Sequence, residues 1–313
     1  MLTSIIILIL GMIALIVSAD KLVDGASAMA KNFGVAPLVI GMTIIAFGSS
    51  APEVVVSGMA ALNGMGDTAI GNVLGSNIAN IGLILGITAI VVPIKISKGT
   101  VSEVPFFLFS TFVGVCALVF SESINIIEGI VLIATLLLFL KIQYKKGMAV
   151  SNVEDEQDIA EMSNAKAFLF IIIGLVGLPI ASNYIVESSV VIAKFFGMSD
   201  LVIGLTIIAV GTSLPELAAS VASVRKKQFD MAIGNVIGSN IFNILAVLSV
   251  PAFMSNAAVD ELAIMRDTPA MVVFSLLLVA FCHSKGKSIT RPFGVLLVLL
   301  YCGYQALVLS SVG

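Results

Sequence analysis

Residues 41–53 read GMTIIAFGSSAPE, and a nearly identical string, GLTIIAVGTSLPE, occupies residues 204–216. A second shared string follows each copy at the same distance, GNVLGSNIAN at 71–80 and GNVIGSNIFN at 234–243. One constant offset aligns both pairs, because it carries position 41 onto 204 and position 71 onto 234. Similarity at a fixed offset indicates an internal repeat. The chain therefore contains two copies of one structural unit.

The composition places both copies in a membrane. With 59% hydrophobic and 11% charged residues, the chain has too little polar surface for a water-soluble globular protein. We expect an all-α integral membrane protein. Segments that are apolar over about 17 to 25 residues, the length that crosses a bilayer, predict ten transmembrane helices, five per repeat. They lie near 3–19, 36–60, 68–93, 104–120, 126–142, 167–186, 200–224, 231–254, 269–283 and 293–311.

The odd number of spans per repeat predicts an inverted pair, because the second repeat then enters the membrane from the opposite side. Basic residues collect on the cytoplasmic side of membrane proteins. With the N-terminus outside, only Lys194 and Arg266 of the basic residues lie outside. We therefore expect a multi-pass protein of the cell membrane, surrounded by the lipid bilayer. It has a first five-helix repeat at 1–141, a cytoplasmic linker at 142–166 and a second repeat at 167–313.

Glu53 and Glu216 are the ionisable residues that fall in the middle of predicted spans. A charged group at this depth costs roughly 2.5 to 3.5 kcal/mol on insertion scales. Each glutamate follows a proline, which removes one helical hydrogen bond and crowds the carbonyl four residues earlier. We expect each glutamate-bearing helix to open there, at Gly48 or Gly211, with loosened carbonyls at 46–48 and 209–211 lining a polar cavity. No Lys or Arg lies at mid-span, so the glutamates are either protonated or bind cations, and the paired arrangement favours a cation site.

Further oxygen-bearing residues share the helical face of each glutamate. Helical spacing groups Ala46, Ser49 and Ser50 with Glu53, and Ala209, Thr212 and Ser213 with Glu216. The next helices carry stripes at every fourth residue: Asn72, Ser76 and Asn80, then Asn235, Ser239 and Asn243. Such residues also join membrane helices by hydrogen bonds. Taken alone, Ser76 or Asn80 fits that structural role better than the role of ion ligand.

The ligand types indicate which ion is bound and how it is moved. Oxygen ligands without Cys or His suit a hard cation such as calcium, sodium or magnesium. Two carboxylates balance one divalent or two monovalent ions, and an empty doubly charged site should cross the membrane poorly, which predicts exchange rather than leak. No phosphate-binding GxxxxGK[ST] loop occurs, so we expect no use of ATP. We also expect no cofactor and no nucleic-acid partner. An intramembrane hydrolase would need His283, which lies among lysines, so we expect no enzyme activity.

The strings GSSAPE with GSNIAN, and GTSLPE with GSNIFN, resemble those of the sodium/calcium exchangers of the cation/calcium antiporter superfamily. The similarity spans nearly the whole chain and is closest to compact prokaryotic members, including bacterial inner-membrane proteins. It implies a secondary-active antiporter that exchanges calcium for sodium by alternating access. It also implies that the first and sixth helices, with Gly11 and Gly174, slide across the rest. The implied ligands of the transported calcium and sodium are Glu53, Glu216, Ser49, Thr212, Ser50, Ser213, Ser76, Ser239, Asn80, Asn243 and the carbonyls of Ala46 and Ala209.

Two positions depart from the family pattern. Asn243 stands where many sodium/calcium exchangers have Asp, and Ser49 stands where Thr is usual. Both bear on ion selectivity. The alternative function is therefore a calcium/proton antiporter that uses the same two glutamates, and a third is a passive cation channel or scaffold. The sequence leaves the oligomeric state open.

Overall fold

The computed structural model describes residues 1–120, 123–149, 161–198, 203–254, 257–284 and 288–311. Within these residues, eight helical segments are long and apolar enough to cross a membrane, and two bent pairs of shorter helices raise the number to ten. The ten-helix prediction is confirmed. The acidic part of the predicted linker falls in 150–160, which lies outside the described residues.

The first repeat contains five of these spans. Its long helices are α1 (Leu2–Phe33), α7 (Lys98–Val119) and α8 (Ile126–Ala149). The second span is bent by 42° and consists of α2 (Pro37–Ile40), a π-helical turn η1 (Gly41–Ile45), α3 (Ala46–Ser49) and α4 (Ala51–Leu62). The third span consists of α5 (Gly66–Ala79), η2 (Asn80–Leu85) and α6 (Gly86–Val91).

The second repeat follows the same plan. Its long helices are α9 (Asn164–Phe195) and α16 (Arg291–Ser310), with η5 (Ala263–Asp267) running into α15 (Thr268–Cys282). Its bent span, at 52°, contains η3 (Gly204–Ile208), α11 (Ala209–Thr212) and α12 (Leu214–Arg225). The next span consists of α13 (Phe229–Phe242), η4 (Asn243–Val247) and α14 (Ser249–Met254).

Helix boundaries recur at the offset seen in the sequence. Helices α4 and α12 begin and end at equivalent positions of the two repeats, and so do α5 and α13. Two short antiparallel ribbons tie the repeats together: β1 (Ile94–Lys95) pairs with β4 (Ser288–Ile289), and β2 (Ser123–Ile124) pairs with β3 (Ala257–Ala258). Each ribbon takes one strand from each repeat. The duplication is therefore structural as well as sequential.

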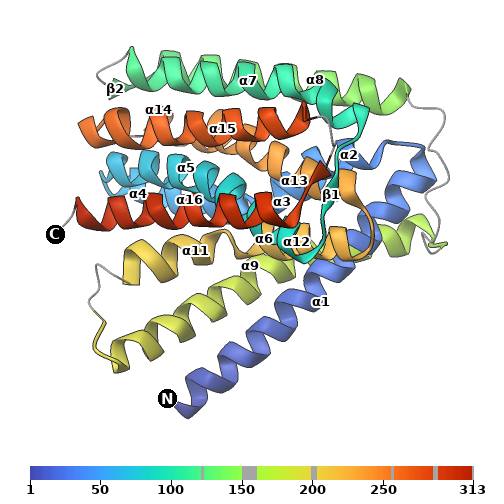
Figure 1. Cartoon of the computed structure of the whole chain (residues 1–313), viewed down its shortest axis with the longest axis horizontal. Coiled ribbons are helices and arrows are strands. Elements are labelled where there is room, and N and C mark those ends of the chain that lie inside the picture. The colour runs from blue at the N-terminus through green and yellow to red at the C-terminus, as the bar shows by residue number, and fades with distance from the viewer. Residues whose placement is uncertain (121–122, 150–160, 199–202, 255–256, 285–287, 312–313) are drawn as a thin grey trace.

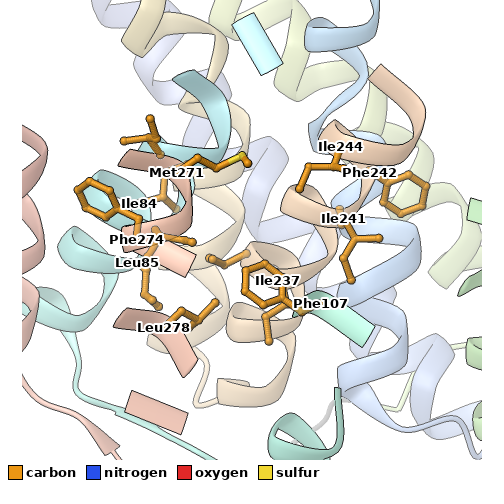
Figure 2. Close-up of a cluster of buried hydrophobic side chains, with 14 of the residues drawn as sticks. Ile84, Leu85, Phe107, Ile237, Ile241, Phe242, Ile244, Met271, Phe274 and Leu278 are labelled. Carbon is orange, nitrogen blue, oxygen red and sulfur yellow. The ribbon is translucent and has the colours of Figure 1, made fainter. Parts of the chain in front are cut away.

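The spans that contain α5 and α13 form the centre of the bundle. Most of each lies inside the protein, whereas α1 and α16 are largely exposed on their apolar faces. Figure 2 shows the apolar core, where Ile237 and Ile241 of α13 lie near Phe107, and Met271 and Phe274 of α15 lie beside Ile84 and Leu85. Exposed apolar side chains on the outer helices are suited to lipid. The polar residues of the central helices therefore lie inside a protein interior rather than against the bilayer.

Helices α1 and α9 pack against each other along much of their length and run at a slant to the other helices (Figure 1). Two glycines allow this close approach. A Cβ atom on Gly174 would collide with Leu22, and one on Gly11 would lie 2.9 Å from Cγ1 of Ile185. Small residues at such positions let helix backbones approach closely in membranes. These are the two helices that the family resemblance describes as mobile.

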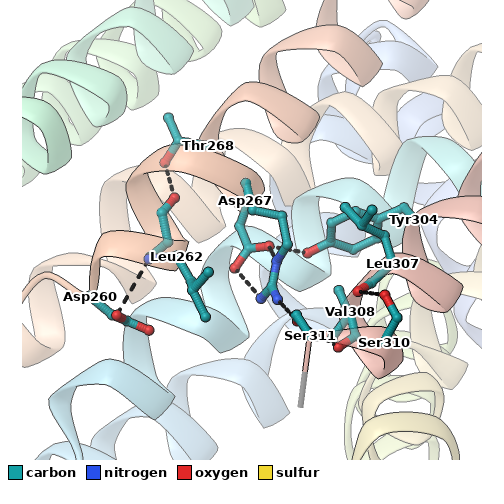
Figure 3. Close-up of polar contacts among 11 residues, drawn as sticks. Asp260, Leu262, Asp267, Thr268, Tyr304, Leu307, Val308, Ser310 and Ser311 are labelled. Atoms are coloured by element: carbon teal, nitrogen blue, oxygen red, sulfur yellow. Dashed lines mark hydrogen bonds and ion pairs between the residues drawn. The ribbon is translucent and has the colours of Figure 1, made fainter. Parts of the chain in front are cut away.

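The fourth and fifth spans of the second repeat are joined by a polar cluster (Figure 3). The buried carboxylate of Asp267 accepts hydrogen bonds from the Tyr304 hydroxyl at 2.9 Å and from Arg266 Nε at 2.6 Å. Arg266 also donates to Ser311 near the end of α16. The first repeat has a similar tie at its own fourth span, where Glu103 on α7 accepts from Gln143 at 2.8 Å and from Lys146 at 2.6 Å on α8. These buried charges are thus paired and hold outer helices together.

Two pairs of π-helical turns surround the predicted site. Turns η1 and η3 occupy equivalent positions of the two repeats, and so do the start points of η2 and η4 at Asn80 and Asn243. Turns η1 and η3 precede the breaks in the two bent spans. The π-helical turn is rare and occurs frequently at functional sites. Its symmetric recurrence here marks the region of the glutamates.

Candidate cation site

Glu53 and Glu216 lie in the first turns of α4 and α12, directly after the break in each bent span. The backbone leaves the helical conformation at Ser50 (φ −82°, ψ 7°) and Ser213 (φ −89°, ψ 4°). The expected opening at Gly48 was therefore two residues too early. Each proline falls in the first turn of the second half-helix, where its missing N–H leaves no helical bond unmade.

Both carboxylates are buried, each with its residue 1% exposed. The Ser50 hydroxyl of the first repeat donates a hydrogen bond to Glu216 Oε1 of the second at 3.1 Å. Among the described residues, Glu53 Oε2 and Glu216 Oε2 have no hydrogen-bond partner. A buried carboxylate without partners is costly unless it is protonated or meets a cation. The geometry thus offers unused carboxylate oxygens inside the bundle.

The other predicted ligands lie in the elements around the break. Ser49 and Ala46 are on α3, Ser76 is on α5, Ser239 is on α13, Thr212 and Ala209 are on α11, and Asn80 and Asn243 begin the π-helical turns. Most of these side chains are buried, Thr212 is partly exposed, and the Ala209 side chain lies outside the described set. Among these predicted ligands, the buried side-chain atoms without a hydrogen-bond partner in the described part of the chain are Ser213 Oγ, Ser239 Oγ, Asn80 Nδ2 and both amide atoms of Asn243.

The backbone carbonyls near the breaks differ in their contacts. The Ala46 carbonyl still accepts the Ser50 N–H at 3.0 Å, so it keeps its place in the helix, and it lies 3.4 Å from the Ser49 hydroxyl, which also donates to it. The Gly211 carbonyl accepts a hydrogen bond from the Ser182 hydroxyl of α9 at 2.6 Å. A carbonyl loosened near the second break therefore contacts one of the two slanted helices.

The structure adds four polar residues that the sequence did not single out as site residues. Asn72 Nδ2 donates to the Glu53 carbonyl at 3.3 Å and to Ser57 Oγ at 3.0 Å. In the second repeat Asn235 Nδ2 donates to the Glu216 carbonyl at 3.2 Å and to Ser220 Oγ at 2.9 Å. Asn72, Glu53 and Ser57 of the first repeat are equivalent to Asn235, Glu216 and Ser220 of the second. The sequence signal for the two serines was that both repeats have serine at this position, although the residues on either side differ between the repeats.

An ion pair joins α1 to the end of α12. Lys226, just beyond α12, lies 2.5 Å from the carboxylate of Asp24 on α1 and 3.0 Å from the Asp20 carbonyl. The equivalent positions of the other repeat hold Asn63 and Glu187. Among the described residues, the Asn63 side chain bonds to Met59 one turn earlier, and Glu187 accepts from Asn183 one turn earlier on α9 at 2.9 Å. In the part of the chain that the structure describes, the ion pair between Lys226 and Asp24 therefore has no equivalent at positions 63 and 187, where each side chain bonds within its own segment.

A cavity of about 350 Å³ lies between α4, α9 and α11. Its lining includes Pro52 and Val56 on α4, Asn183 on α9, and Thr212 on α11. The structure is thus packed between α1 and α12 and hollowed between α9 and α4. An asymmetry of this kind is what a transporter with access from one side at a time requires.

A family model described as "Sodium/calcium exchanger protein" matches residues 3–145 and 166–310, which is most of both repeats. The chain belongs to the sodium/calcium exchanger family. A named relative, CaxA of Alkalimonas amylolytica, to which an antiporter activity is ascribed, is 42% identical to this exchanger over 99% of its chain and all of the relative. The sodium/calcium exchanger MaX1 of Methanosarcina acetivorans is 32% identical over 95% of this chain and 96% of its own.

Solved structures agree with the family. The sodium-calcium exchanger NCX_Mj, soaked with Na⁺ and Ca²⁺, superposes with a TM-score of 0.84 at 33% identity, covering 97% of this chain and 98% of its own. That structure also has ten helices in two repeats. The fold prediction is confirmed: this exchanger is an all-α membrane protein of two inverted five-helix repeats. Its family and fold are those of a cation/calcium antiporter rather than an enzyme.

Proposed function

We propose that the protein is a secondary-active antiporter that exchanges calcium for sodium through one site between the repeats. The observation that carries this proposal is the Ser50–Glu216 hydrogen bond, because it joins the two breaks and places the glutamates at one locus. The unpartnered oxygens Glu53 Oε2 and Glu216 Oε2 are then the charge-bearing ligands. Carboxylate oxygens are preferred ligands of calcium, which takes six to eight oxygens.

The remaining ligands come from both repeats. They are the hydroxyls of Ser49, Thr212, Ser50, Ser213, Ser76 and Ser239, the side-chain oxygens of Asn80 and Asn243, and the carbonyls of Ala46 and Ala209. The buried and unpartnered Ser213, Ser239 and Asn243 atoms support this set. Thr212 also lines the cavity beside α9, which provides a route from one side of the membrane.

Charge explains why transport is coupled. Among the described residues the ion pairs are Lys146–Glu103, Lys226 with Asp20 and Asp24, and Arg266–Asp267, and none of them includes Glu53 or Glu216. An empty site with two buried negative charges is unfavourable. One calcium ion or two sodium ions restore neutrality, so the conformational change is favoured only when a cation is bound.

Access alternates by movement of α1 and α9 across the other helices. The Lys226–Asp24 pair closes the cytoplasmic side in this arrangement, and the cavity beside Thr212 opens outward. This orientation has the N-terminus outside and the linker in the cytoplasm, consistent with the distribution of basic residues. The repeats then correspond to 1–141 and 167–313, and the linker to 142–166.

Calcium binding to the purified protein tests the site. Equilibrium binding of radioactive calcium should be lost in Glu53→Gln and in Glu216→Gln, because each removes a charge from the site. Glu103→Gln is the matched control, since Glu103 is equally buried but is paired with Lys146 away from the breaks. Calcium binding that survives in both site variants would overturn the proposal. Loss of binding in all three variants would place calcium away from the breaks and overturn it as well.

A further inference from the structure

Both the NH₂ group and the oxygen of the Asn235 side-chain amide form hydrogen bonds in the protein interior, where Asn235 is 0% exposed. Its NH₂ group donates to the Glu216 carbonyl and to Ser220 Oγ, and its Oδ1 accepts from the Ser49 hydroxyl at 3.2 Å. These contacts fix the amide orientation, because a flipped amide would set its oxygen against the Glu216 carbonyl oxygen. The side chain therefore has one arrangement.

The contacts of Asn235 connect the two repeats at the level of the ligands. Ser49 belongs to α3 of the first repeat, and Glu216 belongs to α12 of the second. One amide holds the backbone of a charge-bearing ligand and the hydroxyl of another ligand. Asn72 does the same for the backbone of Glu53 in the other repeat, through its bonds to the Glu53 carbonyl and Ser57.

We propose that Asn235 and Asn72 are positioning residues of the cation site, and that Asn235 sets the direction of the Ser49 hydroxyl. This inference rests on the proposed ion site. A serine hydroxyl has one hydrogen and two lone pairs. The Ser49 hydroxyl can donate to Asn235 Oδ1 at 3.2 Å or to the Ala46 carbonyl at 3.4 Å, and the Glu216 carboxylate is a third acceptor within its reach. A hydrogen held by Asn235 points toward protein, which leaves the lone pairs of Ser49 available to a cation.

The physical consequence is selectivity. Calcium requires its oxygens at about 2.3 to 2.6 Å and gains from ligands held in place before it arrives. Without Asn235, the Ser49 hydroxyl is free to turn its hydrogen toward the ion, and α12 loses a contact that fixes the direction of Glu216. Calcium, with its higher charge, should lose more binding than sodium.

Matched control variants lie on the same two helices. Asn240 on α13 is as buried as Asn235, but in the described part of the chain its Nδ2 donates to the Val236 carbonyl of its own helix at 2.7 Å and to no other group. Asn77 on α5 contacts Met271 Sδ at 3.6 Å and serves as the control for Asn72. Removal of the side-chain amide should lower the stability of the folded protein in all four alanine variants. Of these four asparagines, Asn235 and Asn72 are the two that hydrogen-bond to the backbone of a site glutamate among the described residues.

The experiment measures calcium and sodium affinity of the full-length purified protein, with radioactive calcium and sodium competition. Asn235→Ala should weaken calcium binding about tenfold and sodium binding less, a change within the range of coupling between contacting residues. Asn240→Ala should leave both affinities within about twofold. In a Ser49→Ala background the effect of Asn235→Ala should shrink, because the hydroxyl that it orients is gone.

Several results would overturn the inference. Equal effects of Asn235→Ala and Asn240→Ala, an additive double-mutant cycle with Ser49→Ala, or an unchanged calcium-to-sodium affinity ratio would each reduce Asn235 to a packing role. If Asn235→Ala does not fold, the comparison of Asn72→Ala with Asn77→Ala decides, since Asn72 is half-buried and better tolerates truncation. Loss of calcium binding in Glu53→Gln alongside unchanged binding in Asn235→Ala would reject this inference alone and leave the proposed function standing.

Discussion

The Ser50 hydroxyl and the Glu216 carboxylate lie 3.1 Å apart across the boundary between the two repeats. The two residues are 166 positions apart in the chain, and each lies at or just after the break in its own bent span. This contact exists only because the repeats interlock. It is the reason that two separate sequence motifs form one cation site in our proposal.

Removal of the Ser50 hydroxyl should weaken that site. Ser50→Ala leaves Glu216 Oε1 without its donor, and a hydrogen bond to a charged group contributes about 1.5 to 3 kcal/mol. We expect calcium affinity to fall about tenfold or more, measured by equilibrium binding. Ser110→Ala is the control, because Ser110 is buried but bonds only to the Phe107 carbonyl of its own helix. Equal affinities in the two variants would contradict the role of Ser50.

A third carboxylate at position 243 should change the charge balance. Both amide atoms of Asn243 are buried without a hydrogen-bond partner among the described residues, so Asn243→Asp adds a negative charge without breaking an observed bond. We expect tighter sodium binding and a greater number of sodium ions exchanged per calcium. The measurement is the response of calcium uptake to an imposed membrane potential, with Asn240→Asp as the control on the same helix. A potential response identical to the wild type would contradict this prediction.

Gly174 should limit movement between α1 and α9. Its missing side chain leaves room for Leu22, so Gly174→Ala overpacks the contact, at a cost of about 1 to 3 kcal/mol. If these helices slide during exchange, the variant should show a lower exchange rate with little change in calcium affinity. Gly303→Ala is the control, because a Cβ at Gly303 on α16 meets nothing within 4 Å. An unchanged exchange rate in a folded Gly174→Ala protein would argue against sliding at this contact.

Loss of the Lys226–Asp24 ion pair should shift the conformational balance modestly. The side chains of Lys226 and Asp24 are 29% and 40% exposed, and pairs of this exposure contribute about 0.2 to 1 kcal/mol. In our proposal this pair stabilises the conformation in which the cavity at Val56 is open. Lys226→Met should therefore reduce the population of that conformation, relative to the alternate one, by up to about fivefold. The measurement is thiol labelling of Val56→Cys in a protein that lacks its three native cysteines.

Lys146→Met provides the comparison for that labelling, since it breaks the pair with Glu103 between α7 and α8, away from the slanted helices. Slower labelling at position 56 in Lys226→Met but not in Lys146→Met is the expected pattern. Equal labelling in both variants would show that the Lys226 ion pair does not hold the closed side.

The sequence predicted the membrane-spanning helices and the location of the two glutamates within broken spans, because both follow from local composition. Apolar length fixes a membrane span, and a buried glutamate after a proline marks a broken one. The predicted position of the break was wrong by two residues, because Pro52 lies in the first turn of α4 instead of interrupting a continuous helix. Helical periodicity also gives no sign of a π-helical turn such as η1, whose extra residue per turn is set by packing.

The contacts between repeats could not be predicted. Asn235 was one residue of a polar stripe, and nothing local distinguishes a bond to Ser49 from a bond within its own helix, as Asn240 makes. The Lys226–Asp24 pair joins residues 202 positions apart. Partners at such distances depend on how the helices pack.

The coupling ion is the central claim, and calcium uptake into proteoliposomes tests it most directly. The purified protein is reconstituted, and radioactive calcium uptake is compared under an outward sodium gradient and an outward proton gradient at equal membrane potential. We predict uptake driven by the sodium gradient, and none above background in Glu53→Gln. Uptake driven by the proton gradient alone would assign the glutamates to calcium/proton exchange, and uptake indifferent to both gradients would contradict antiport through this site.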